Sequence, residues 1–422
     1  MRILYDFAIL CYTCGIRIAA IFGNQKARKW LDGRRNQEEK IKDKLRLAPD
    51  NRIWFHCASL GEFEQGRPLL DKIKSNDPST FIILTFYSPS GYEIRKNYPG
   101  ADLVCYLPAD SKKNAARFIE LLRPSVTIFV KYELWLHFFE ELLVRNRPVY
   151  VVSAVFRPGQ FFFKWYGAFL KKILKQVNGI FVQDRQSFNL LEKHKFENVF
   201  QAGDTRFDRV RLIASQKQNL KRIETFAGDK KILVAGSTWP DDESMILNTL
   251  LSEKMHSFRL IIAPHEVHGE RIHALIAKIH QKNANAKVVQ YSSEENAGNA
   301  DVLIMDTIGI LSMVYSYGTI AWIGGGFGRG IHNILEAAAF GLPVLFGPNY
   351  QKFREAVDLI QLGGAFSIST PEEAAHLLKT LVEDENRLKE SSIAASTYVN
   401  SQAGATEKIL SEISLPFRQT VS

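Results

Sequence analysis

Residues 321–347 read AWIGGGFGRGIHNILEAAAFGLPVLFG, which combines two short apolar runs with a glycine run and a helical pattern. The pattern predicts a buried strand over 321–323, a helix from about His332, and a second strand after Pro343. Glycines fill five of the seven positions 324–330. At the carboxyl end of a strand they let backbone N–H groups approach a ligand, and the positive end of the next helix favours an anion. We therefore expect an anion site here; the alternative is a tight connection without a ligand.

Glu336 follows Asn333 by three residues, so it lies one turn into the expected helix. A carboxylate does not favour a phosphate, but it accepts hydrogen bonds from the hydroxyl groups of a sugar. The combination predicts a nucleotide that is bound by its ribose and its phosphate.

The rest of the chain repeats the alternation of strands and helices. A chain of 422 residues exceeds the usual size of one core, so two domains are expected. The first domain has seven strand candidates, IWFHC, FIILTF, DLVCY, SVTIFV, PVYVVSA, GIFVQD and NVFQ; the second has KILVAGST, FRLIIAP, AKVVQYS, ADVLIMD, TIAWIGG, LPVLFG and GAFSIS. This is the pattern of an α/β fold with two Rossmann-like domains facing a central cleft. The expected boundaries are 1–22 for an anchor helix, 35–210 for the first domain, 211–230 for a linker, 231–395 for the second domain and 396–422 for a final helix and tail.

The totals favour an intracellular enzyme with an anionic partner. Hydrophobic residues make up 46% of the chain, charged residues 23%, and the net charge is +9. The cysteines, Cys11, Cys14, Cys57 and Cys105, are too few for a disulfide framework. The histidines show no metal-binding spacing, so neither a metal nor a cofactor is expected.

Residues 3–22 are long enough to cross a hydrocarbon layer, yet Asp6 and Arg17 interrupt them. On a helix, Arg2, Asp6, Thr13 and Arg17 share one polar stripe. We expect a helix that spans the membrane or lies at its interface, with a buried soluble helix as the alternative. The basic residues that follow predict that the body lies on the cytoplasmic side of the membrane. A second aromatic and basic segment, residues 157–175, fits either a membrane interface or nucleic acid, and the first helix favours the membrane over nucleic acid. The alternative is a buried aromatic helix with an ordinary basic face.

Polar residues follow the ends of several expected strands, where open α/β sheets bind ligands. In the first domain Glu62 is suited to act as a general base, or is a helix-terminal glutamate without a catalytic role. Glu64 competes with Glu62 for this role, because two residues apart on a helix only one of them faces a cleft. Glu133 has a salt bridge or cap as its alternative, and Arg206 either binds a carboxylate or phosphate or pairs with Asp204 or Asp208.

In the second domain, Ser237 is expected to donate to a phosphate, and His265, after Pro264, to contact a base or phosphate. The segment Gly309, Ile310 and Leu311 offers backbone donors and an apolar wall for a nucleobase.

With these residues assembled, the chain resembles the Kdo transferases, GT-B enzymes that transfer 3-deoxy-manno-octulosonic acid (Kdo). The matching segments, taken in order, are Ser59–Glu62, Glu133–Trp135, Asp204–Asp208, Gly236–Thr238, Asp306–Gly309, Gly324–Gly326, His332–Glu336 and Pro343–Pro348. The resemblance covers nearly the whole chain.

The resemblance implies an inverting glycosyltransferase that moves Kdo from CMP-Kdo to the lipid A precursor (lipid IVA) in lipopolysaccharide biosynthesis. Glu62 would be the general base, with Glu133 and Arg206 supporting the transition state or the sugar carboxylate. CMP would be held by residues of the second domain: Ser237, Pro264, His265, Gly309, Ile310, Leu311, Asn333, Ile334, Leu335 and Glu336. No metal is implied.

The chain departs from the family pattern at several charged positions. His265-Glu266 stand where the family has Arg-His, Ile310 replaces a glutamate, Arg206 replaces a lysine, and Lys131-Tyr132-Glu133 replace Glu-Thr-Glu. These departures affect the expected phosphate contacts and leave Glu62 and Glu336 unchanged. Two alternatives are a GT-B transferase or epimerase that uses a UDP-sugar, and a non-catalytic module that binds anionic lipid or nucleic acid.

Overall fold

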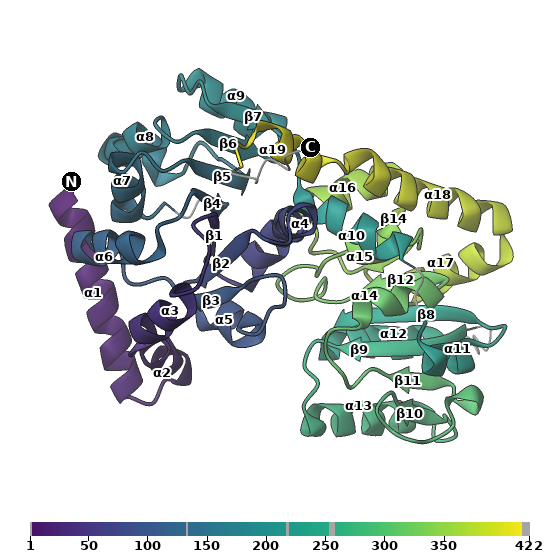
Figure 1. Ribbon diagram of the computed structural model, residues 1–422. Coiled ribbons are helices and arrows are strands. Elements are labelled where there is room, and N and C mark those ends of the chain that lie inside the picture. Colours follow the sequence, from purple (N-terminus) through teal and green to yellow (C-terminus); the bar gives the residue numbers. More distant parts are fainter. Residues whose placement is uncertain (1, 132–133, 217–218, 253–257, 416–422) are drawn as a thin grey trace. The chain divides into compact units, whose positions relative to one another are not determined.

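The computed structural model describes residues 2–131, 134–216, 219–252 and 258–415. The chain divides into two compact units, Met1–Arg209 with Ala403–Ser422, and Val210–Gln402. Each unit contains one seven-stranded sheet in which every pair of neighbouring strands is parallel (Figure 1).

The first sheet has the order β3-β2-β1-β4-β5-β6-β7. Its strands are β1 (Arg52–Cys57), β2 (Phe81–Phe86), β3 (Leu103–Tyr106), β4 (Val126–Val130), β5 (Val149–Ala154), β6 (Gly179–Val182) and β7 (Val199–Gln201). The helices of this unit are α1 (Arg2–Ile21), α2 (Gln25–Asp32), α3 (Gln37–Leu45), α4 (Leu60–Asn76), α5 (Pro89–Arg95), α6 (Lys112–Leu122), α7 (Leu136–Val144), α8 (Ala168–Leu174), α9 (Arg185–Lys193) and α19 (Ala405–Glu412), with short 3-10 turns η1 (Phe161–Phe163) and η2 (Trp165–Gly167). Helix α10 (Thr205–Ser215) crosses the boundary between the units.

The second sheet has the order β10-β11-β9-β8-β12-β13-β14. Its strands are β8 (Lys231–Thr238), β9 (Phe258–Pro264), β10 (Val288–Gln290), β11 (Val302–Ile304), β12 (Ile320–Ile323), β13 (Val344–Phe346) and β14 (Ala365–Ser367). Its helices are α11 (Lys221–Ala227), α12 (Pro240–Ser252), α13 (Gly269–Lys282), α14 (Leu311–Val314), α15 (Leu335–Ala339), α16 (Arg354–Gln361), α17 (Pro371–Glu383) and α18 (Glu385–Gln402), with 3-10 turns η3 (Ala297–Asn299) and η4 (Tyr315–Tyr317).

Both sheets have a point at which the order of the strands reverses. In the first unit this point lies between β1 and β4, and in the second between β8 and β12. Ligands of open α/β sheets bind outside the carboxyl ends of the strands at this point. The topology therefore predicts that ligands bind near the residues that follow β1, β4, β8 and β12.

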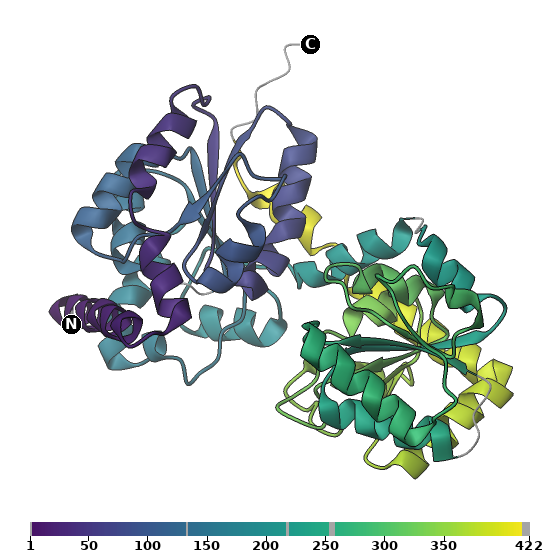
Figure 2. The ribbon, with the colours of Figure 1, turned by 90° about the horizontal axis from the view of Figure 1, so that it is seen from below.

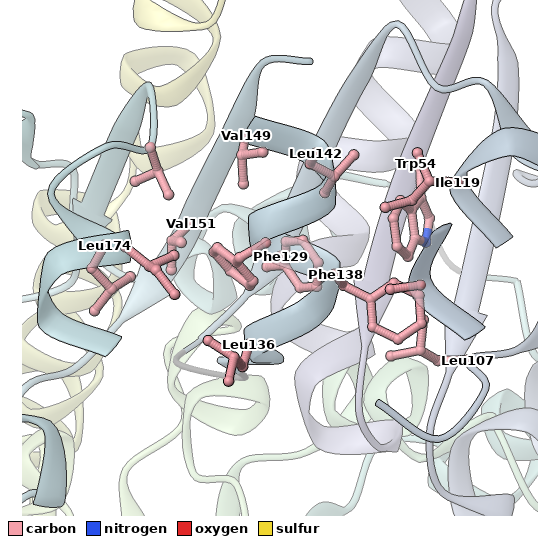
Figure 3. Packing of buried hydrophobic residues seen from close by; sticks show 14 of the residues in the cluster. Trp54, Leu107, Ile119, Phe129, Leu136, Phe138, Leu142, Val149, Val151 and Leu174 are labelled. Atoms are coloured by element: carbon pink, nitrogen blue, oxygen red, sulfur yellow. The ribbon is translucent and has the colours of Figure 1, made fainter. Parts of the chain in front are cut away.

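The central strands β1 and β4 of the first sheet are buried on both faces, as expected for a parallel sheet covered by helices. On one face Trp54 packs with Phe129 and with Phe138 of α7, and Figure 3 shows these rings among aliphatic side chains. On the other face Phe55 belongs to a cluster that contains residues of α4 and Ile409 of α19. Figure 2 shows α19, in yellow, beside the first sheet.

Helix α1 is confirmed as the expected apolar helix, and within the described residues it is the one long and apolar enough to cross a membrane. Large apolar side chains of one face are more than half exposed: Ile3, Leu4, Phe7, Leu10, Ile18, Ile21 and Phe22. The other face contacts the unit along its length. Tyr5 donates to Asp110, Asp6 lies 2.6 Å from the ring of His137, and Arg28 of α2 donates to the carbonyl of Ala20.

Candidate functional site

Glu62 lies in the first turn of α4, directly after the carboxyl end of β1. The sequence predicts this position because Ser59 is a favoured residue at a helix start and the apolar run of β1 precedes it. The Glu62 side chain is 14% exposed, accepts a hydrogen bond from the Ser59 hydroxyl, and has its Oε1 3.6 Å from Lys131 Nζ. Lys131 follows β4, so both sides of the reversal contribute to this site.

Lys131 is held in an uncommon backbone conformation. Its φ is +65°, in the left-handed region that non-glycine residues rarely adopt. Strain of this kind is often concentrated at functional sites. Here it occurs where the chain leaves β4 and the Lys131 ammonium meets the carboxylate.

Glu64, the competing carboxylate, has a structural role. Its two oxygens pair with Arg95, at 2.8 Å, and with Arg209 of α10. The pairing ties α4 to α5 and α10, and it supports Glu62 as the carboxylate of α4 that is available for chemistry.

Arg206 pairs with Asp204, one of the two partners anticipated as an alternative. Its Nε lies 2.8 Å from Asp204 Oδ2, and the Asp204 carboxylate also accepts from the Arg206 backbone N–H. The start of α10 is fixed to α4, because the Thr205 hydroxyl donates to the carbonyl of Gln65. Asp208, the other candidate partner, instead accepts from the backbone N–H groups of Gly404 and Thr406. Glu133 lies outside the described residues.

Trp135, two residues after Glu133 in the sequence, belongs to a buried hydrogen-bond network with His56 and Thr85. The Trp135 indole donates to His56 Nε2 at 3.0 Å, so the other ring nitrogen, Nδ1, carries the proton and donates to Thr85 Oγ1 at 2.9 Å. Burial, with a smaller effect of Arg34, lowers the pKa of His56 to about 3. A neutral His56 therefore holds Trp135 in place.

In the glycine run of the second unit, most backbone N–H groups donate to other groups of the protein, contrary to the prediction. The N–H of Gly325 donates to Asp242 Oδ2 at 2.8 Å, and that of Gly324 donates to the carbonyl of Gly236. The N–H groups of Gly328 and Gly330 both donate to the carbonyl of Gly325. The prediction that the glycines present their N–H groups to an anion is thus wrong for four of the five positions.

Close backbone packing explains these glycines instead. A Cβ on Gly324 would lie 2.2 Å from the carbonyl oxygen of Ser237, and one on Gly326 would lie 2.5 Å from the nitrogen of Gly347. Gly325 also has a φ of +91°. The run lets β12, β13 and the turn after β8 approach one another, which side chains would prevent.

The helix expected from about His332 begins three residues later, at Leu335. Two contacts prevent an earlier start: the His332 N–H donates to the carbonyl of Gly324, and the Asn333 side chain accepts from the Leu335 N–H. Asn333 Nδ2 also donates to Glu336 Oε1 at 3.1 Å. Glu336 is therefore in the first turn of α15, where the amide of Asn333 orients its carboxylate.

Three rings stack at the carboxyl ends of β8, β9 and β12. His265 stacks against both Trp239 and His332, with ring centroids 4.6 Å and 4.5 Å away. Trp239 and His332 lie edge to edge, because the Trp239 indole donates to His332 Nε2 at 2.9 Å. Burial, with a smaller effect of His265, lowers the pKa of His332 to about 4, so this ring is neutral. The flat, partly exposed stack is suited to a nucleobase or a ribose face.

The structure brings most of the expected nucleotide residues to this end of the sheet. Thr238, next to Ser237, pairs with Pro264 across the sheet, and the His265 N–H donates to the carbonyl of Thr238. A Cβ on Gly236 would lie 3.3 Å from a methyl group of Leu311 and 1.9 Å from the Tyr315 hydroxyl. The Glu336 carboxylate adds to the effect of burial in raising the pKa of Tyr315. Leu311 thus lies against Gly236, the residue before Ser237, and Gly309 and Ile310 directly precede Leu311 in the chain.

Sequence reasoning missed Trp239, His332 and Asp242 as site residues. Trp239 had one signal, its position directly after Gly236-Ser237-Thr238 at the end of a strand. Asp242 had none, because its partner Gly325 is 83 residues away.

Comparison with known proteins shows which family the chain resembles. Residues 26–209, which lie within the first unit, match the family described as 3-deoxy-D-manno-octulosonic-acid transferase (kdotransferase). Curated 3-deoxy-D-manno-octulosonic acid transferases of Rickettsia prowazekii and Aquifex aeolicus are each 28% identical, over 380 and 344 residues. These alignments cover 87% and 80% of this chain, and 80% and 88% of those proteins. Over most of its length the chain is therefore similar to Kdo transferases, which are glycosyltransferases.

The solved structures show the same architecture at low identity. UDP-GlcNAc 2-epimerase from Neisseria meningitidis has a TM-score of 0.59 and 16% identity, covering 86% of this chain and 99% of that protein. A 2-epimerase described as putative, from Listeria monocytogenes, has a TM-score of 0.55 and 14% identity, with 85% and 94% covered. At these identities the likeness concerns the fold alone, and it confirms the expected GT-B type with two Rossmann-like domains.

Proposed function

We propose that this protein is a Kdo transferase of lipopolysaccharide biosynthesis, which moves Kdo from CMP-Kdo to a hydroxyl group of the lipid A precursor with inversion at the anomeric carbon. The acceptor hydroxyl gives its proton to Glu62 while its oxygen forms a bond to the anomeric carbon. The bond from that carbon to the phosphate oxygen breaks, and CMP leaves with the electron pair. The observation that supports this most is the Glu62 carboxylate at the reversal of the first sheet, oriented by Ser59 and Lys131.

Three features make Glu62 suitable as the base. It is mostly buried, it has a hydroxyl and an ammonium group fixing its orientation, and its neighbour Glu64 is occupied by two arginines. A positioned carboxylate that receives a proton in the transition state typically contributes about 10²- to 10⁴-fold to the rate.

The second unit would bind the donor. We assign the nucleotide to the stack of Trp239, His265 and His332, with Glu336 accepting from the ribose hydroxyls. The backbone N–H groups of Gly309–Leu311 would receive the phosphate, because those of the glycine run are largely used within the protein. Ser237, Asn333, Ile334 and Leu335 would complete this pocket. Arg206 would exchange part of its pairing with Asp204 for the Kdo carboxylate, and Glu133 would support the transition state.

The first unit would be seated on the cytoplasmic face of the inner membrane, with α1 lying at the interface. The inner face of α1 contacts the unit from Tyr5 to Ala20. If α1 crossed the bilayer with these contacts intact, charged residues such as Asp110 and Glu140 would enter hydrocarbon. Trp165 and Tyr166, 83% and 40% exposed, would join α1 at the membrane surface, because Phe169 of the same segment packs against Tyr5 at 6.3 Å.

The decisive experiment is Glu62→Gln with Glu64→Gln as its neighbouring control. Glu62→Gln should lower kcat by at least about 100-fold and leave CMP binding unchanged, since the amide cannot accept the proton. Glu64→Gln should lower thermal stability but keep most of the turnover of the folded enzyme. Lipid products are identified by mass spectrometry, and a Glu62→Gln enzyme with near-normal turnover would overturn the assignment.

A panel of donors separates CMP-Kdo from a UDP-sugar. The enzyme is given lipid A precursor with CMP-Kdo, UDP-glucose or UDP-N-acetylglucosamine, and release of CMP or UDP is measured. Only CMP-Kdo should be consumed; consumption of a UDP-sugar with formation of a glycosylated lipid would support the alternative donor.

A further inference from the structure

A large cavity separates the polar stripe of α1 from the body of the first unit. Its volume is about 990 Å³, at the upper end of the range for small-molecule sites. Asp6, Thr13 and Arg17 of α1 line one wall, and residues of α3, of α6 and of the segment before α6 line the others. Figure 1 shows α1 beside α6 and α3 at this edge of the unit. The polar stripe of the otherwise apolar helix therefore faces a partly open pocket, in which the side chains of Arg17, Lys112 and Lys113 are exposed.

The cavity has an excess of uncompensated positive charge. Three of its carboxylates are engaged: Asp110 accepts from Tyr5 and from two backbone N–H groups, Asp6 pairs with His137, and Glu38 pairs with Lys42 and Arg117. Among the cations, Arg34 donates to three backbone carbonyls. This leaves Arg17, Lys112 and Lys113, for which the described part of the chain contains no acidic partner, against one such carboxylate, Glu39.

Two of these cations stand where a helix disfavours them. Lys112 and Lys113 are the first two residues of α6, at the positive end of an 11-residue helix. A cation at this end is destabilising, and a bound anion would reverse the effect. Part of the remaining cavity wall is apolar, with Ile9 and Leu10 of α1 and Phe118 and Leu121 of α6, and part is polar, with Asn36, Gln37 and Asn114.

We propose that this cavity binds the phosphate-bearing headgroup of an anionic membrane phospholipid. The phosphate would lie between Arg17, Lys112 and Lys113, and the first carbons of the acyl chains would lie against Ile9 and Phe118. This proposal depends on the proposed position of α1 at the membrane interface, and it adds the class of lipid that the first unit binds there. It is separate from the base Glu62, which does not line the cavity.

The test uses the full-length enzyme and short-chain lipids below their micelle concentration, so that no charged membrane surface is present. Binding of dihexanoylphosphatidylglycerol is measured by calorimetry for the unmodified enzyme, for Lys112→Ala/Lys113→Ala, and for Lys40→Ala/Lys44→Ala. Lys40 and Lys44 lie exposed on α3 outside the cavity, so the control removes the same charge from the same unit. We expect one lipid per chain, an affinity at least about tenfold lower in the cavity variant, and no change in the control.

Several results would overturn the proposal. One is equal binding by the two double variants, which would mean diffuse electrostatic attraction. A second is equal affinity for glycerol phosphate and the lipid, which would mean a soluble phosphate ester as ligand. A third is competitive inhibition of Kdo transfer by the short-chain lipid, which would make the cavity the acceptor site. Kdo transfer by Lys112→Ala/Lys113→Ala, measured with detergent-dispersed acceptor, should remain normal. A proposed function that is wrong would instead show no transfer by the unmodified enzyme.

Discussion

Burial of His56 makes the stability of the first unit depend on pH. In the unfolded chain this residue takes up a proton near pH 6.5, whereas in the folded unit its pKa is about 3. The contribution of His56 to the free energy of unfolding is therefore fully present above pH 6.5, and stability is lost as the pH falls toward 3. Between pH 7 and pH 5 we expect a loss of about 2 kcal/mol from this residue.

His56→Gln tests this dependence, since glutamine can accept from Trp135 and donate to Thr85 without titrating. Chemical denaturation followed by tryptophan fluorescence at pH 7, 6 and 5 should give a flatter decline for this variant. His376→Gln, on the exposed side of α17, should keep the decline of the unmodified enzyme. An unchanged decline in His56→Gln would contradict the role of His56.

Asp242 is the residue that holds the glycine run. Its Oδ2 accepts from the N–H groups of Trp239 and Gly325, while its buried Oδ1 has no hydrogen-bond partner and burial raises its pKa. Asp242→Ala should destabilise the second unit by about 2–4 kcal/mol, because two N–H groups lose their acceptor. Asp242→Asn keeps that acceptor and should cost less than half as much. Thermal denaturation measures both, and equal losses would refute this account.

At the scale of the element, variants of the glycine run can distinguish two reasons for the glycines, namely close backbone packing and the approach of a ligand. Gly326→Ala should destabilise the second unit by at least about 2 kcal/mol, because its Cβ would meet the backbone of Gly347. Gly328→Ala should be nearly neutral, since the nearest atom is the Gly325 carbonyl oxygen at 3.6 Å. If both variants are stable and both lose CMP binding, the glycines serve the ligand after all.

The strands were predictable from the sequence, and the use of the glycines was not. Each strand is a short apolar run between turn residues, so both seven-stranded sheets follow from local pattern. A glycine run has the same local signature whether a ligand or a neighbouring backbone approaches it. The start of α15 was also misjudged, because the His332 N–H is bonded to Gly324 and the helix begins only after Asn333.

The site could be predicted where it follows from chain order. Glu62, Ser237 and His265 follow strand ends, and parallel strands end at one edge. The stack of Trp239, His265 and His332 depends on contacts between residues up to 93 positions apart, which one sequence does not reveal. The sequence predicted that, if Arg206 formed an ion pair, its partner would be Asp204 or Asp208. The structure shows that the partner is Asp204.

At the scale of the whole molecule, the proposed attachment to the membrane depends on the outer face of α1. Phe7 and Ile18 are 62% and 55% exposed and lie outside the cavity. Phe7→Glu/Ile18→Glu should lower partition into phospholipid vesicles by at least about tenfold, with thermal stability and transfer to detergent-dispersed acceptor retained. Sedimentation with vesicles measures the partition. The matched control is Leu362→Glu/Ile393→Glu, two similarly exposed residues of the second unit, and it should partition normally.

Helix α19 gives the first unit an unusual order of assembly. Ile409 and Ile413 belong to the same buried cluster as Phe63, Leu69 and Ile73 of α4, yet they are synthesised after all of the second unit. During translation part of the apolar face of α4, the helix that carries Glu62, therefore remains uncovered until residues 405–413 have been synthesised. The second unit consists of the continuous segment Val210–Gln402, so its residues are all synthesised before those of the first unit are complete. A nascent chain stalled before residue 405 should therefore expose α4 to chaperones.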